Sequence, residues 1–215
     1  VGINYAVAKD IASGNNEDVS RDVHTAMLSS LLFGSVIGFL GIIGARGILE
    51  LINTPEEIID QAALYLSIYF GGLPGIALYN AGASIVRSIG DTKRPMYYLV
   101  AAGIVNVILN LYFVIVMGMN VEGVAIATTV SNYLSCFLMI KAMLNEEGSL
   151  KFIPSKLCID KRSISEIVNT GVPSAVQSSM YGITNILIQS AINSFGAVVI
   201  AGSAAAANVE NFMYI

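Results

Sequence analysis

Residues 95–121 read PMYYLVAAGIVNVILNLYFVIVMGMNV, a stretch without a single Asp, Glu, Lys or Arg. An uncharged stretch of 18 residues or more is typical of a transmembrane helix, because about 20 residues are needed to cross the hydrocarbon core. Four more such stretches occur, at residues 25–45, 61–86, 123–140 and 167–209. The sequence therefore predicts an all-α fold, a polytopic transmembrane helix bundle.

The stretch at residues 167–209 is too long for one crossing and is expected to hold two helices. Its most natural break is Ser194-Phe195-Gly196. Apolar segments at residues 1–12 and 197–215 lie at the two ends of the chain and look truncated. Seven helical segments are thus expected, and those between the two ends look complete.

The overall composition agrees with a membrane protein. Of the 215 residues, 55% are hydrophobic and 12% are charged, whereas soluble domains have about 25% charged residues. Cys136 and Cys158 show neither metal-ligand spacing nor a disulfide framework, so both are expected to be free thiols. No catalytic triad, phosphate-binding loop or basic nucleic-acid patch stands out. The sequence therefore indicates a lipid-embedded protein that is not an enzyme and has no nucleic-acid partner.

The orientation follows from the basic residues, because Lys and Arg gather in the cytoplasmic connections of membrane proteins. Arg46 stands alone on one side. All the others fall in alternate connections: Lys9, Arg21, Arg87, Lys93, Arg94, Lys141, Lys151, Lys156, Lys161 and Arg162. These connections are predicted to face the cytoplasm, as in a multi-pass protein of the plasma membrane.

The segment at residues 61–86 contains Gly71-Gly72-Leu73-Pro74-Gly75 near its middle. Proline removes a backbone donor and glycine permits bending, so this helix is expected to be kinked or locally unwound. Gly72, Pro74 and Gly75 are therefore candidate hinge residues, and Pro173 is another. A static packing kink explains the same pattern equally well.

The one long connection, residues 144–165, carries both charge signs and ends in Ser163-Ile164-Ser165-Glu166, a capping-box pattern. Ser163 is therefore expected to cap the helix that follows. His24 has no partner at metal-ligand spacing and is expected to be solvated, without a role.

Several motifs resemble the multidrug and toxic compound extrusion (MATE) family of transporters. The most specific is the Arg-x-x-Gly-Asp-Thr-x-x-Pro-Met pattern that begins at Arg87, which is similar to a cytoplasmic turn of that family. The other matching stretches are Asn106–Asn110, Val121–Thr128, Gly171–Ser174 and Val23–Ala26.

The resemblance implies a twelve-helix transporter of two six-helix lobes. This chain would hold helix two to part of helix eight, with residues 1–143 in the N-terminal lobe, 144–165 as the inter-lobe cytoplasmic loop and 166–215 opening the C-terminal lobe. The implied function is secondary active export of amphipathic or cationic drugs and toxins by alternating access, in exchange for Na⁺ or H⁺ and together with the remainder of the parent transporter. A lipid-linked saccharide flippase of the same superfamily is the alternative, although the helix interiors lack the Lys or Arg that a phosphate would favour.

The resemblance also implies a cation site. The family's first-lobe site resembles a cluster of an Asp on helix one, an Asn-x-x-x-Asp pair on helix five and a Thr on helix six. Asn106 matches the Asn and Thr128 the Thr, whereas Asn110 stands where the family often has Asp, and helix one is not in this chain. Amide and hydroxyl oxygens suit Na⁺, and packing between polar helices is the other interpretation. No other metal site and no cofactor is expected beyond Na⁺ or H⁺ as the coupling ion.

Two further sets of polar residues lie in expected helices. Glu210 would lie near the middle of the bilayer, where a carboxyl is costly and suits cation coupling, or else is a structural group bonded to a neighbour. In the helix expected after residue 166, polar side chains recur at spacings of three and four, so they lie on one face and predict the wall of a cavity. The alternative is that they form hydrogen bonds between packed helices. The candidate cavity residues are Gln177, Tyr181, Asn185 and Gln189, together with Tyr79 and Asn80.

Overall fold

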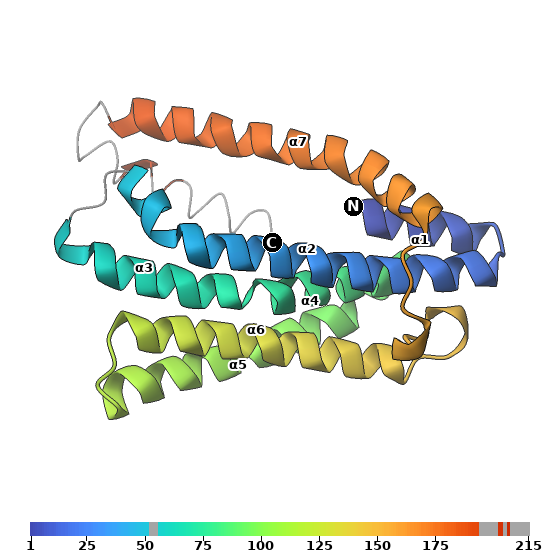
Figure 1. Ribbon diagram of the computed structural model, residues 1–215, viewed down its shortest axis with the longest axis horizontal. Helices are drawn as coiled ribbons and strands as arrows, with labels where there is room; N and C mark the ends of the chain where they lie inside the picture. Colours follow the sequence, from blue (N-terminus) through green and yellow to red (C-terminus); the bar gives the residue numbers. More distant parts are fainter. Residues whose placement is uncertain (52–55, 194–201, 204–205, 207–215) are drawn as a thin grey trace. The chain divides into compact units, whose positions relative to one another are not determined.

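The computed structural model describes residues 1–51, 56–193, 202–203 and 206. Its α-helices are α1 (Gly2–Ala12), α2 (Asn16–Leu51), α3 (Glu56–Gly71), α4 (Leu73–Ser88), α5 (Lys93–Leu111), α6 (Val121–Leu144) and α7 (Lys161–Asn193) (Figure 1). A π-helical turn, Tyr112–Val116, extends α5, and two 3-10 turns, Gly148–Leu150 and Pro154–Lys156, lie between α6 and α7. The described residues contain no strand, so the all-α prediction is confirmed.

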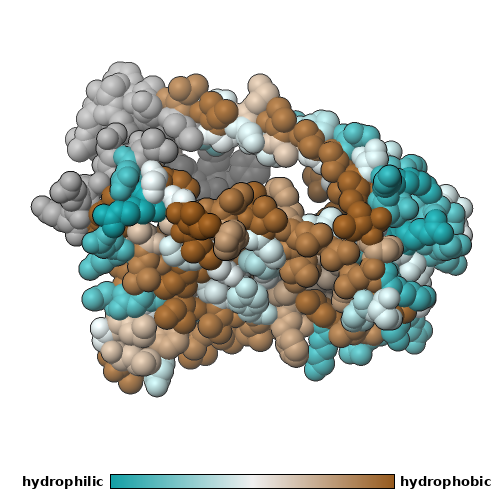
Figure 2. Space-filling model, viewed as in Figure 1, coloured by the Kyte–Doolittle hydropathy of each residue, from teal (hydrophilic) through white to brown (hydrophobic). Residues whose placement is uncertain are grey.

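Four helical stretches in the described part of the chain are long and apolar enough to cross a bilayer. They are Asn16–Glu50, Ile58–Ser88, Lys93–Val116 and Val121–Leu144. Each matches one of the first four predicted crossings, but the third ends at Val116 and not at residue 121. Figure 2 shows the hydrophobic residues along the helices and the hydrophilic ones gathered towards their ends. Helix α7 forms as predicted but is more polar than these four. The predicted break at 194–196 lies outside the described residues, as does nearly all of segment 197–215.

The chain divides into two compact units, Val1–Thr170 and Gly171–Ile215. The first unit holds α1 to α6 and the first turns of α7, and α7 continues into the second. The lobe boundaries at residues 143 and 166 stay predictions.

In the first unit, α2 packs against α3 and α4, and α6 packs against α3, α4 and α5. The buried core gathers where α1, the first half of α2 and the last turns of α4 and α6 meet, around Val23, Met27, Ile85 and Met139. Helix α5 instead exposes a row of large apolar side chains, as a lipid-facing helix does. They are Leu99, Val100, Ile104, Val107 and Ile108, each more than half exposed.

The predicted interruption at residues 71–75 is present, because α3 ends at Gly71 and α4 begins at Leu73. The N–H of Gly72 donates to the carbonyl of Tyr69 (2.9 Å), one residue closer than in an α-helix. Two hydroxyls of α6 donate to carbonyls beside the interruption: Thr129 to Ile68 (3.1 Å) and Tyr133 to Gly71 (2.7 Å). Within a bilayer such groups must find partners inside the protein. Whether the interruption moves stays a prediction.

Three glycines of α2 let this helix approach the interruption closely. A Cβ on Gly34 would lie 2.7 Å from Cβ of Ala77, and one on Gly38 would lie 2.7 Å from the carbonyl oxygen of Phe70. A Cβ on Gly41 would collide with the ring of Phe70. The Gly-x-x-x-Gly spacing of residues 34–38 is typical of such close contacts between helices.

Helix α7 begins at Lys161, earlier than expected, and the prediction that Ser163 caps it is wrong. The carboxylate of Asp160 accepts the backbone N–H of Ser163 (3.0 Å) and is the cap. This N–H holds the pKa of Asp160 below its usual value. Arg162, in the first turn, pairs with Asp10 of α1 (3.1 Å) and with Asp18 of α2. These partners lie far away in the sequence, so a local pattern could not place the helix start.

We expect Gly38→Ala and Gly47→Ala to change stability in opposite directions. Both gain helix propensity, worth about 1 kcal/mol, and a Cβ on Gly47 meets nothing within 4 Å. A Cβ on Gly38 would strike backbone, and overpacking of this kind costs about 1–3 kcal/mol. Thermal unfolding of the detergent-solubilised protein measures both; stabilisation by Gly38→Ala would contradict the close approach.

Asp160→Ala should lower the thermal stability at neutral pH, because it removes the cap of α7. Since folding lowers the pKa of Asp160, the contribution is present above the ordinary pKa of Asp and is lost as the pH falls through the lowered value. The difference between Asp160→Ala and the parent should therefore shrink as the pH falls below the ordinary pKa of Asp, about 3.9. Asp160→Asn, which can also cap, should lose less; equal losses for both variants at neutral pH would argue against the cap.

Candidate functional site

Three of the predicted cation-site residues come together between α5 and α6. Asn110 Nδ2 donates to Oδ1 of Asn106, one turn earlier on α5 (3.0 Å). Asn106 Nδ2 lies 3.4 Å from the hydroxyl oxygen of Thr128 on α6, and this hydroxyl donates to the carbonyl of Val124 (2.9 Å). We call Asn106, Asn110 and Thr128 the amide cluster.

One oxygen of the amide cluster lacks a partner among the described residues. Asn110 Oδ1 is buried and accepts no hydrogen bond. A buried acceptor without a partner is costly, and it is common only where a water, an ion or a function accounts for it. The cluster offers two amide oxygens and a hydroxyl, which are hard ligands that suit Na⁺. None of these three residues is a carboxylate, so their own contribution to a cation would be that of neutral dipoles.

Tyr79 and Asn80, predicted together as cavity residues, lie in different surroundings. Tyr79 is buried, and its hydroxyl donates to the carbonyl of Pro95 (2.9 Å). It joins α4 to α5 within this chain, and its assignment to a cavity wall stays a prediction. Asn80 is exposed and lines a pocket of about 430 Å³ within the first unit. The other lining residues come from α1, α2, α4 and the first turns of α7, among them Ser29, Ser30, Phe33 and Ser84.

The predicted polar face of α7 is present in the second unit. Gln177, Tyr181 and Thr184 line a shallow pocket of about 290 Å³ with Met180. Asn185 is exposed on the same helix, and the side chain of Gln189 lies outside the described residues. The hydroxyl of Thr184 donates to the carbonyl of Met180 within the helix (2.9 Å). Gln177 and Tyr181 are thus the members of this face best placed to meet a bound molecule.

The two remaining predicted residues are Pro173, a candidate hinge, and Glu210, a candidate coupling carboxyl. Pro173 lies inside α7, not at its start, because the helix already begins at Lys161. It stands close to Gly171, where the second compact unit begins. Glu210 lies outside the described residues, so its role as a coupling carboxyl stays a prediction.

The Arg87–Met96 motif forms an anchor at the turn between α4 and α5. Arg94 makes a two-pronged ion pair with Glu146 after α6 (2.8 and 2.9 Å) and also binds Asp91. The guanidinium of Arg94 holds the pKa of both carboxyls below their usual values. Asp91 also accepts the backbone N–H groups of Lys93 (3.0 Å) and Arg94 (3.1 Å) at the start of α5. The motif therefore orients a turn, and Glu146 is a partner that the sequence did not reveal.

His24 was also misjudged from the sequence. It was expected to be solvated, yet it is 1% exposed and both ring nitrogens are hydrogen-bonded. A partner beyond residue 150 buries it, and no local pattern could indicate that contact.

Comparison with known proteins shows which family this chain resembles. A family model described as MatE matches residues 1–112, just over half of the chain. The probable multidrug resistance protein YoeA of Bacillus subtilis is 26% identical over 204 residues, which are 91% of this chain and 44% of YoeA. The FAD transporter of Shewanella oneidensis is 22% identical over 218 residues, which are 100% of this chain and 48% of that protein. The chain thus spans less than half the length of these relatives.

Solved structures agree on the fold. A MATE transporter in a bent conformation matches with a TM-score of 0.85 and 21% identity, over 93% of this chain and 45% of that one. An inward-facing multidrug resistance transporter of the family matches with a TM-score of 0.75 and 22% identity, over 81% of this chain and 40% of that one. With more than half of its length matched by the family model, the chain belongs to the MATE family, whose members are transporters and not enzymes.

Proposed function

We propose that this chain forms part of a secondary active transporter of the plasma membrane, which exports amphipathic or cationic drugs and toxins by alternating access. The amide cluster between α5 and α6 is the observation that carries the proposal. It is a half-buried polar site with one buried, unpaired oxygen, and nearly all other buried side-chain polar atoms of the described residues have partners. Polar groups inside a membrane bundle are costly and mark ion or substrate pathways. The names of the relatives support the same class of activity.

The chemistry of the amide cluster favours Na⁺ as its ion. Amide and hydroxyl groups do not gain a proton near neutral pH, so this cluster cannot bind H⁺ as a carboxylate would. Na⁺ binding would occupy the unpaired Asn110 Oδ1 and would draw on the oxygens of Asn106 and Thr128. Coupling to H⁺ would need a carboxyl elsewhere, and Glu210 is the candidate. We therefore propose Na⁺ at the amide cluster.

The polar face of α7 supports the proposed substrate class. Gln177, Tyr181 and Thr184 provide hydrogen-bonding groups and one aromatic ring without any formal charge. Aromatic faces attract organic cations, whereas a phosphate-bearing substrate would favour Lys or Arg. We propose that this face contacts the exported compound in the complete transporter, where the remainder of the parent protein supplies the rest of the pathway.

The first test is efflux of a cationic dye from vesicles that contain the full-length transporter, driven by a Na⁺ gradient or a pH gradient. We expect a Na⁺ gradient to drive efflux. Asn110→Ala should raise the Na⁺ concentration for half-maximal efflux by about tenfold, the effect of one lost contact to a charged group. Asn132→Ala, on α6 outside the cluster, is the control. Efflux driven by pH alone and abolished by Glu210→Gln would move the coupling ion to H⁺, and no dye efflux under either gradient would favour the flippase.

The second test separates substrate from ion. Gln177→Ala and Tyr181→Ala should raise the KM for the dye several-fold while the Na⁺ dependence of efflux stays as in the parent, because these residues lie on α7 and the amide cluster lies on α5 and α6. Efflux at several dye and Na⁺ concentrations separates the two effects. A change in Na⁺ dependence with an unchanged KM would contradict the assignment of this face to the substrate.

A further inference from the structure

The connector between α6 and α7, residues 145–160, is fastened to the early turns of α2. The hydroxyl of Thr25 donates to the carbonyl of Cys158 (3.3 Å) and accepts the N–H of Asp160 (3.1 Å). His24, the preceding residue, accepts the N–H of Ile153 at Nε2 (3.0 Å). Both side chains are almost completely buried, at 1% and 0% exposure. We call His24 and Thr25 the clasp.

The partners of His24 determine its protonation state. Nδ1 lies 2.6 Å from the carbonyl oxygen of Ser20, which can only accept, so Nδ1 carries the hydrogen. The backbone N–H of Ile153 can only donate, so Nε2 must present its lone pair. The clasp therefore needs a neutral ring in one tautomer. A second proton, on Nε2, would face another N–H and would break the bond to Ile153.

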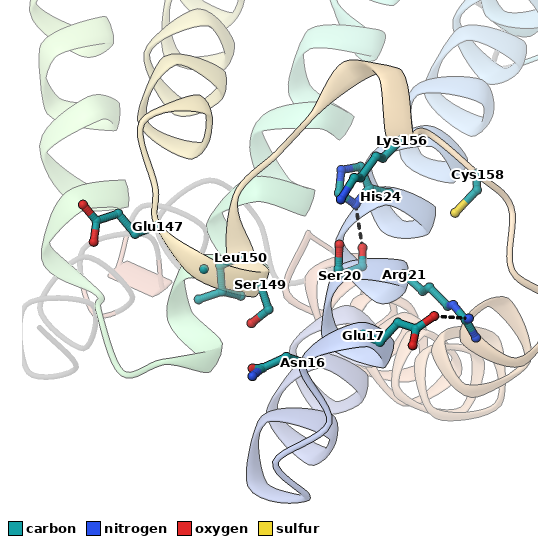
Figure 3. Close-up of a pocket in the computed structure, with 11 residues that line it drawn as sticks. Asn16, Glu17, Ser20, Arg21, His24, Glu147, Ser149, Leu150, Lys156 and Cys158 are labelled. Carbon is teal, nitrogen blue, oxygen red and sulfur yellow. Dashed lines mark hydrogen bonds and ion pairs between the residues drawn. The ribbon is translucent and has the colours of Figure 1, made fainter.

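The groups around the ring do not offer it a charged partner. His24 lines a pocket of about 730 Å³ (Figure 3), whose charged groups are Glu17 and Arg21 of α2 and Glu147 and Lys156 of the connector. Glu17 and Arg21 pair with each other (2.5 Å). On its other side the ring stacks on Phe152, with centroids 5.8 Å apart, and Phe152 belongs to the apolar core. Both ring nitrogens are engaged by backbone groups, so a protonated ring would keep only the bond to Ser20.

The clasp holds the start of α7 because the connector ends at Asp160, directly before this helix. Asp160, whose N–H binds Thr25, is also the residue whose carboxylate caps α7. Helix α7 then continues through Thr170 into the second compact unit. Anything that loosens the clasp therefore frees the start of the helix that joins the two units.

We propose that His24 and Thr25 are positioning residues that fix the start of α7 on α2. The proposal goes beyond the transport function and does not depend on the ion or the substrate. It gives a role to the Val23–Ala26 motif.

Amide hydrogen exchange probes the clasp directly, because the N–H of Asp160 is bound by Thr25 and the N–H of Ile153 is bound by His24. In the full-length transporter, Thr25→Val keeps the shape of the side chain and removes both of its hydrogen bonds, so exchange at Asp160 should be roughly tenfold faster. Thr25→Ser keeps the hydroxyl, and exchange should be as in the parent. Equal exchange rates for Thr25→Val and Thr25→Ser would overturn the clasp.

Discussion

The fold of the first unit depends on the pairing of backbone carbonyls beside the interruption between α3 and α4. In hydrocarbon an unpaired carbonyl costs several kcal/mol, and the Gly-Gly-Leu-Pro-Gly sequence disturbs the regular helical ladder there. Thr129 and Tyr133 of α6 donate to two of these carbonyls. The glycines of α2 allow that helix to lie against the same place. Helices α2 and α6 are thereby held at the interruption between α3 and α4, which explains why α6 packs against both of them.

The cost of an unpaired polar group in hydrocarbon also applies to the amide cluster. Hydroxyls in this bundle mostly donate to carbonyls, as Ser131 does to Ala127 (2.8 Å). The two asparagines of the amide cluster depart from this pattern. Asn110 donates to Asn106, and the Oδ1 atom of Asn110 has no partner among the described residues. On the same helix α5 the apolar row from Leu99 to Ile108 is exposed. A helix that offers apolar side chains outward and a half-satisfied amide pair towards α6 is suited to hold an ion.

Much of this architecture could be predicted from the sequence because it is set locally. Uncharged stretches located the first four crossings, Gly and Pro located the interruption, and the spacing of Asn106 and Asn110 placed both on one face. The errors have long-range causes. Asp160 starts α7 with the help of Arg162, whose partners Asp10 and Asp18 lie on α1 and α2. His24 is buried by Ile153 and Phe152. None of these contacts produces a periodic pattern in the sequence.

The central claim is that the amide cluster binds Na⁺, and thermal unfolding of the purified full-length protein in NaCl and in choline chloride tests it most directly. A ligand that binds only the folded state stabilises it by about 2.7 kcal/mol at a concentration 100 times its Kd. We predict a saturable rise in Tm with NaCl that choline does not produce. Thr128→Val should reduce this rise, because it removes one of the oxygens, while Thr128→Ser should keep it. Equal Tm values in the two salts, with folded protein in both, would contradict the account.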